Sequence, residues 1–164
     1  YRDVLLATAL HLSGKNIALL IPDAARWPRP RPLTLTLRDR GDLAQHFAIS
    51  AAIAAWAGEP LASAVGLDKE LDDSRDGSGF SFVDLAADRA GTRLGELAAR
   101  NPRRLAAALA AGLDDSALLP PVGDLPESMK ADEFRRRFGG PDAPAYRRMS
   151  DEIDRRLDAL ALFR

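Results

Sequence analysis

The sequence predicts an all-α protein: a single helical domain spanning residues 1–164, bundled around one buried central helix, with a short extended proline-rich arm. Three observations support this fold class. The run from Leu43 to Gly58 is almost wholly apolar and uncharged. Apolar residues recur at helical spacing in most segments, and helix caps and breakers punctuate them. A chain of 164 residues, 46% hydrophobic and 29% charged, can bury a sizeable core within one domain.

The N-terminal segment predicts one helix followed by a stretch of uncertain structure. Leu5, Ala9 and Leu12 form a helical stripe, and Gly14 follows where a C-terminal cap is expected. Residues 16–22, NIALLIP, are too short and too apolar for periodicity to distinguish a strand from a helix.

Residues 27–37 predict the extended arm. WPRPRP at 27–32 should adopt polyproline II, because alternating prolines fix φ and remove amide donors. We favour a stiff connector over a ligand for an aromatic groove or an anion contact. LTLTL at 33–37 alternates with period two and predicts a short strand or extended arm. It could pair with residues 17–21 or lie across the helices.

The central helix is predicted to run from Asp42 to Ala57. Asp42 and Gln45 have the spacing of a capping box. Since nearly every following position is apolar, the helix should be covered on most sides. His46 and Ser50 lie one turn apart on one face, and burial would oblige both side chains to find polar partners.

The remaining helices are marked by prolines, caps and glycines. A third helix should start at Pro60 and end near Ser74, before the RDGSG turn. Ser81 should cap a fourth, which continues to about Arg100. Further helices are expected at residues 102–112, 133–138 and 145–162, with a loop at LPPVGDLP.

Composition narrows the classes of partner. Lys and Arg number 23 against 24 Asp and Glu, so the net charge of −1 disfavours nucleic acid and anionic membrane surfaces. The longest charge-free run is shorter than the roughly 18 to 20 residues of a membrane span. The absence of cysteine removes disulfides and thiolate chemistry. No basic region precedes an apolar run at the start, so we expect any targeting segment to lie outside this sequence.

Polar residues concentrate on two of the predicted helices. On the third, Lys69 and Asp73 stack one turn apart with Glu70 beside them. On the fourth, Asp84 and Asp88 share a narrow arc with Gly91 and Gly95.

The two glycines indicate where a neighbouring helix crosses. Each costs about 1 kcal/mol relative to alanine inside a helix, so Gly91 and Gly95 predict close backbone approach. If the neighbour is the second or third helix, His46 and Ser50 would converge with the acidic residues. Arg89, Arg93 and Glu96 should instead lie on a solvated flank.

Three chemical interpretations of these residues compete. In the first, Lys69 and His46 neutralise the acids in a network that fixes helix packing. In the second, His46 and carboxylates bind zinc, manganese or iron. No HExxH, second nearby histidine or calcium-loop spacing accompanies them, so we assign no metal ligands and expect no cofactor.

The third interpretation is acid–base hydrolysis of a glycan. Glu70 would be the proton donor, with a pKa raised by burial, and Asp73 or Asp84 would be the base or electrostatic partner. Serine hydrolysis is disfavoured because the sequence around Ser81 lacks the second glycine of a G-x-S-x-G elbow. The GSG at 77–79 lacks the lysine of a phosphate loop.

The motif string resembles a family of bacterial envelope proteins. It comprises HF-x2-S at residues 46–50, G-x2-KE-x2-D at 66–73 and GFSF-x-DL-x-AD-x2-G at 79–91. It is similar to the YfiM-like putative lipoproteins and, more distantly, to the helical VanZ-like membrane proteins. The resemblance covers roughly residues 42–96. Asp68 departs from it, standing where a glycine, aromatic or other neutral residue is expected.

The resemblance implies a helical, envelope-associated protein and no particular reaction. The residues that match the pattern are His46, Ser50, Lys69, Glu70, Asp73, Ser81, Asp84, Asp88 and Gly91.

The sequence thus predicts a periplasmic or envelope-associated bacterial protein whose polar cluster organises the bundle and binds an envelope glycan or lipid. The alternative is a small hydrolase of cell-envelope glycan with Glu70 as general acid. The candidate catalytic residues are Glu70, Asp73 and Asp84, and the candidate binding residues are His46, Ser50, Lys69, Ser81 and Asp88. No oligomeric state follows from the sequence.

Overall fold

The structure is a computed structural model that describes residues 1–28, 31 and 33–164 of the chain. Within these residues the fold is all-α, which confirms the predicted fold class. The α-helices are α1 (Arg2–Leu12), α2 (Gly41–Ala57), α3 (Glu59–Asp76), α4 (Phe82–Arg100), α5 (Pro102–Ala111), α6 (Asp115–Leu118), α7 (Ala131–Phe138) and α8 (Pro144–Asp158). Two short 3₁₀ helices, Ile17–Leu19 and Pro22–Arg26, follow α1. None of the helices described here is long and apolar enough to cross a membrane.

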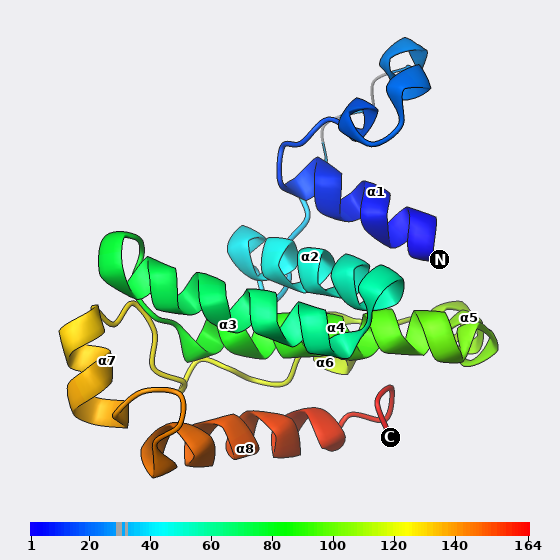
Figure 1. Cartoon of the computed structure of the whole chain (residues 1–164). Helices are drawn as coiled ribbons and strands as arrows, with labels where there is room; N and C mark the ends of the chain where they lie inside the picture. Colours follow the sequence, from blue (N-terminus) through cyan, green and yellow to red (C-terminus); the bar gives the residue numbers. More distant parts are fainter. Residues whose placement is uncertain (29–30, 32) are drawn as a thin grey trace.

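Helices α2 and α4 form the middle of the bundle and make the most extensive helix–helix contact (Figure 1). α1 packs on the outer side of α2, while α3 folds back from the end of α2 and contacts both central helices. α8 runs along the other side of α4. The predicted central helix, α2, therefore shares the centre of the bundle with α4. In α4, 13 of 19 residues are buried, compared with 10 of 17 in α2.

Gly91 and Gly95 of α4 allow the backbones of α2 and α4 to touch, as the sequence predicts. A Cβ at Gly91 would overlap the carbonyl oxygen of Phe47, and one at Gly95 would overlap that of Ala51. Because the contacts at 47 and 51 on α2 match those at 91 and 95 on α4 in the same order, the two helices run parallel. This register sets His46 and Ser50 of α2 opposite the acidic face of α4.

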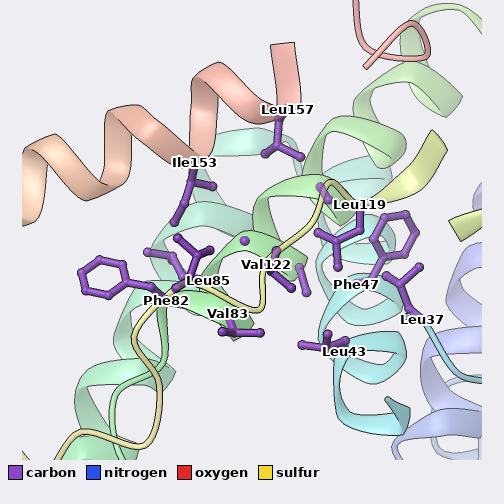
Figure 2. Close-up of a cluster of buried hydrophobic side chains, with 14 of the residues drawn as sticks. Leu37, Leu43, Phe47, Phe82, Val83, Leu85, Leu119, Val122, Ile153 and Leu157 are labelled. Atoms are coloured by element: carbon purple, nitrogen blue, oxygen red, sulfur yellow. The ribbon is translucent and has the colours of Figure 1, made fainter. Parts of the chain in front are cut away.

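Apolar side chains from α2, α4, α8 and the α6–α7 connection fill the core (Figure 2). Figure 2 shows Ile153 and Leu157 of α8 directed toward Leu85 of α4, with Leu119 and Val122 of the connection between α8 and α2. These side chains are at most 6% exposed. Fully burying a residue of this kind contributes about 1.5 to 3 kcal/mol, so this core supplies much of the folding free energy.

An aromatic cluster packs against the turn between α3 and α4. Phe80 stacks on Phe134 of α7 with ring centroids 4.1 Å apart, and Tyr146 of α8 packs on both Phe80 and Phe134. Phe80 also exchanges two backbone hydrogen bonds with Met129, of 2.7 and 3.0 Å. The turn between α3 and α4 is therefore fixed from both sides.

Several local predictions are wrong. Asp42 does not cap α2, because its carboxylate accepts hydrogen bonds from the guanidinium of Arg40, the residue at the N-cap. Of the two alternatives predicted for residues 33–37, a strand or an extended arm, the strand is wrong: these residues form no strand in the described chain, and only an isolated bridge joins Leu37 to Arg40. The predicted polyproline segment lies partly outside the described residues.

Other boundaries shift by a few residues. α3 begins at Glu59, one residue before the predicted proline, and α7 begins at Ala131. α8 ends at Asp158, short of the predicted 162, and α6 was not predicted at all. The ambiguous stretch at 16–22 is mostly 3₁₀ helix and projects with Pro22–Arg26 from the bundle beyond α1 (Figure 1).

Candidate functional site

A polar cluster lies where α2, α3 and α4 meet. It consists of five side chains from the predicted site: His46, Ser50, Glu70, Asp84 and Asp88. Each is at least nine-tenths buried, and Glu70 is fully buried. The parallel register of α2 and α4 brings His46 and Ser50 to Asp84 and Asp88. Helix α3 folds back beside them and adds Glu70.

His46, Ser50 and Asp88 form the hydrogen-bonded part of the cluster. The Nδ1 atom of His46 lies 3.2 Å from Oδ1 and 3.3 Å from Oδ2 of Asp88. The Ser50 hydroxyl donates to Asp88 Oδ1 over 2.8 Å. Since a carboxylate can only accept, this arrangement puts the imidazole proton on Nδ1. In the neutral imidazole the other ring nitrogen, Nε2, then carries the lone pair; it lies 3.7 Å from Asp84 Oδ2.

Glu70 is held by the turn that precedes α4. Its Oε2 accepts a hydrogen bond of 2.9 Å from the backbone amide of Ser81, and the Ser81 hydroxyl accepts from the amide of Asp84 over 3.0 Å. Ser81 is therefore the N-cap of α4, as predicted, and its amide also orients the glutamate. The second oxygen, Glu70 Oε1, is buried without any hydrogen-bond partner.

Asp84 is also short of partners. Its Oδ1 is buried and accepts no hydrogen bond. The nearest cation on that side is the guanidinium of Arg40, whose Nη2 lies 3.9 Å away and is hydrogen-bonded to Asp42. One ligand atom from each of His46, Glu70 and Asp84 can be chosen so that all three lie within 4.8 Å of one another.

Burial and crowding shift the pKa values of these groups. Burial, reinforced by the charge of Asp84, raises the pKa of Glu70 to about 7. Burial also raises the pKa of Asp84, although the charge of His46 opposes the shift. Burial lowers the pKa of His46, but the hydrogen bond and charge of Asp88 outweigh it, so the net pKa is raised. The cluster thus gathers two acidic groups that resist losing their protons and an imidazole that tends to gain one.

Lys69 and Asp73 lie at the edge of the cluster and pair with each other. Lys69 is half-exposed, and its Nζ is 3.7 Å from the unpartnered Oε1 of Glu70. Burial lowers the pKa of Lys69, but the hydrogen bond to Asp73 and neighbouring negative charges raise it overall. Apart from Lys69, the carboxylate of Asp73 has no charged partner among the described residues. Lys69 therefore lies beside both Asp73 and Glu70.

Two residues near the cluster were not identified from the sequence. Arg40 was missed because its approach to Asp84 depends on the loop before α2. Gly66 was seen only as part of a motif, but α3 comes so close to α4 there that a Cβ would lie 3.0 Å from Asp88 Oδ2. A glycine in the middle of a predicted helix is the signal that could have identified this contact.

The prediction that Arg89 and Arg93 lie on a solvated flank of α4 is wrong. Arg89 and Arg93 are mostly buried against α8: Arg89 donates to Asp154 over 2.7 Å, and Arg93 pairs with Asp154 and Asp158. Sequence alone could not reveal α8 as their partner.

The larger cavities lie away from the core of the cluster. A groove of about 700 Å³ runs over α3, α4, α5 and the C-terminal turn, and its polar lining includes Arg89, Arg93, Glu96 and Arg104. A smaller pocket of about 110 Å³ reaches Asp88 between Gly66 and Tyr146. Neither cavity is lined by His46, Glu70 or Asp84.

The geometry limits the chemistry. A glycosidase places its two carboxyl groups on either side of a bound sugar, about 5 to 9.5 Å apart with room for the substrate. Glu70 is fully buried and lines neither of these cavities, so a sugar could reach it only after the helices separate. The closely spaced nitrogen and oxygen atoms suit a proton or a small cation instead.

Comparison with known proteins found no matching family model, no matching curated protein and no matching solved structure.

Proposed function

We propose that this chain is a bacterial cell-envelope protein whose polar cluster joins α2, α3 and α4 and binds a small ligand. The observation that carries the binding role is the pair of buried, unpartnered oxygens, Glu70 Oε1 and Asp84 Oδ1. A buried network that serves packing alone is expected to satisfy its polar atoms, because each unsatisfied one costs about 1 to 3 kcal/mol. The envelope assignment rests on the motif resemblance over residues 42–96.

The burial of the cluster restricts the size of that ligand. Glu70 has no exposed surface, and Asp84 and His46 are each 9% exposed. An ion or a water molecule fits this environment. An envelope glycan or lipid would have to contact the groove on the other flank of α4 instead, where arginines and acidic residues line a much larger space.

The organising role is tested by replacing Asp88 with alanine. The substitution Asp88→Ala leaves the buried His46 and Ser50 without their shared acceptor. We expect the free energy of unfolding, measured by urea denaturation in the presence of a chelator, to fall by about 2 to 3 kcal/mol. Asp68→Ala on the exposed face of α3 is the matched control and should change stability by less than about 0.5 kcal/mol. Equal effects of the two variants would contradict the organising role.

The envelope location needs a separate measurement. Fractionation of the source bacterium, followed with an antibody against this chain, should recover the protein with the envelope or periplasmic fraction. Recovery with the cytoplasm would remove that part of the proposal.

The alternative function, glycan hydrolysis, is favoured by one observation: the pKa of Glu70 is about 7, which suits a general acid at neutral pH. The burial of Glu70 argues against it. Incubation with peptidoglycan fragments should release no reducing ends from either the wild type or Glu70→Gln. Release by the wild type alone, with both proteins equally folded, would replace the proposed function with hydrolysis.

A further inference from the structure

We propose that the ligand of the polar cluster is one divalent transition-metal ion, held by His46 Nε2 and by a carboxylate oxygen from each of Glu70 and Asp84. This inference rests on the proposed function, because it names the ligand of the same cluster. It assigns each of the three helices one ligand, so the ion would tie α2, α3 and α4 together at a single point.

The first argument is the spacing of the three ligand atoms. All lie within 4.8 Å of one another, and His46 Nε2 is 3.7 Å from Asp84 Oδ2. Nitrogen and oxygen ligands bind zinc at about 2.0 to 2.2 Å, which places two neighbouring ligands of a tetrahedral site about 3.4 Å apart. Closing the site therefore requires the ligand atoms to draw together from separations of at most 4.8 Å to about 3.4 Å.

The second argument is independent of the first. Glu70 Oε1 and Asp84 Oδ1 are buried and accept no hydrogen bond from any described group. Two carboxyl groups beside each other in a poorly hydrated site resist ionising together, and a cation between them would relieve the repulsion of the ionised forms and occupy the oxygens that accept no hydrogen bond. A network built only for packing has no need of this arrangement.

The third argument is the orientation of His46. Histidines that bind metals usually donate their other ring N–H to a carboxylate or carbonyl, which fixes the tautomer and the ring plane. In this structure Nδ1 faces Asp88, Asp88 accepts from Ser50, and Nε2 lies 3.7 Å from Asp84 Oδ2, where a metal ion would take the place of a proton on Nε2. Asp88 and Ser50 are therefore positioning residues for the imidazole ligand.

The ligand set also selects the class of ion. One imidazole nitrogen with two carboxylate oxygens suits zinc, manganese or iron, whereas calcium and magnesium favour sites made of oxygen alone. The two nearby side-chain cations do not fill this role. Lys69 is paired with Asp73, and Arg40 with Asp42 and Glu127; their nitrogens lie 3.7 Å from Glu70 Oε1 and 3.9 Å from Asp84 Oδ1, respectively.

The test begins with wild-type protein stripped with a chelator and then titrated with Zn²⁺, Mn²⁺ or Co²⁺. We expect one ion per chain by elemental analysis after gel filtration, and a melting temperature that rises with free metal as mass action requires. The Co²⁺ complex should show visible absorption bands typical of mixed nitrogen and oxygen coordination. A wild-type protein that retains no ion and melts at the same temperature with and without metal overturns the inference.

Matched variants locate the ion. Glu70→Gln and Asp84→Asn keep the shape of each side chain but remove its charge, and should weaken binding more than a hundredfold. Asp88→Asn should weaken it about 10- to 100-fold while keeping one ion per chain. Controls are Asp68→Asn, exposed on α3, and His11→Ala, which removes the other of the two histidines in the chain. Both controls should bind as the wild type does.

Two further outcomes decide the inference. Binding that survives in both Glu70→Gln and Asp84→Asn, or that disappears in His11→Ala, would place the ion elsewhere and overturn it. Testing two ligand variants ensures that a failure of one to fold does not prevent the decision. If no ion binds and Asp88→Ala still destabilises the chelated protein, the metal inference falls while the organising role of the cluster stands.

Discussion

The two flanks of α4 both bring charged side chains against a neighbouring helix, but the charges are paired differently on each flank. Toward α2 and α3, the helix presents Asp84 and Asp88 to a buried imidazole and a buried glutamate. Toward α8, it presents Arg89 and Arg93 to Asp154 and Asp158. Both flanks juxtapose charges across a helix interface.

The flanks differ in whether every charged oxygen accepts a hydrogen bond. On the α8 flank Asp154 is half-exposed and Asp158 is exposed, and the arginines donate to their carboxylates and to the Ser150 carbonyl, so the charges are hydrogen-bonded. On the other flank the charges are buried, and two carboxylate oxygens accept no hydrogen bond, with the nearest cations, Lys69 and Arg40, 3.7 and 3.9 Å away. Under the proposed binding role, the comparison distinguishes two kinds of charged interface: one that only holds helices together satisfies its polar atoms, and one that binds a ligand would leave some unsatisfied until the ligand arrives.

The largest expected effect comes from separating the two helices on the buried flank. Gly91→Ala places a Cβ where the Phe47 carbonyl oxygen lies, and should lower the free energy of unfolding by about 3 kcal/mol or more. Gly123→Ala is the control, since a Cβ at that position meets no atom within 4 Å. Urea denaturation of both variants measures the difference. If Gly91→Ala is as stable as the control, α2 and α4 do not approach as closely as described.

The next largest effect is a pH dependence of the folding stability, which arises from Glu70 on the buried flank. In chelated protein, the folded state holds the Glu70 proton up to about pH 7, whereas the unfolded chain releases it near pH 4.5. The glutamate therefore favours folding most below pH 4.5, and this contribution is lost as the pH rises through 7. Its full size is about 3 kcal/mol.

The groups facing Glu70 are Lys69, Asp84, His46 and the Ser81 amide. We expect Glu70→Gln to remove most of the pH dependence of stability between pH 5 and 8, as measured by urea denaturation across that range. An unchanged pH dependence in this variant would show that Glu70 is solvated in the folded protein.

The smallest effect is expected on the α8 flank. Asp154→Asn removes the shared partner of Arg89 and Arg93, but all three side chains are partly solvated. Exposed ion pairs contribute about 0.2 to 1 kcal/mol, so the loss should lie in this range and shrink at high salt. Urea denaturation at low and high NaCl measures it. A loss as large as that of Asp88→Ala would abolish the contrast between the two flanks.

The features that the sequence predicts well are those encoded by neighbouring residues. The Ser81 cap, the break at Gly77–Gly79 and the helix of Pro102 follow from backbone chemistry within a few positions. Gly91 and Gly95 also predicted a close crossing, because glycine in a helix interior is costly unless another backbone approaches. The sequence could not say that α2 is the partner.

The features that the sequence predicts poorly depend on partners far along the chain. Arg89 was expected in solvent because nothing near it reveals α8, more than 60 residues away. The period-two pattern at 33–37 predicts a strand only if a second strand is available to pair with it. The gathering of His46 with Asp84 and Asp88 was a hypothesis for the same reason, since helix pairing is not a local property.

The backbone contact at Gly91 means that the geometry and the chemistry of the cluster are encoded at different positions. Gly91 lies one turn beyond Asp88, and its neighbour Phe47 directly follows His46, so the distance between the polar faces of α2 and α4 is set outside the cluster. The close approach of α2 and α4 therefore does not depend on the identity of the five polar residues alone, although those residues add to the stability of the bundle. Under the proposed binding role, substitutions within the cluster would alter the ligand, while the contact between Gly91 and Phe47 would preserve the position of the site.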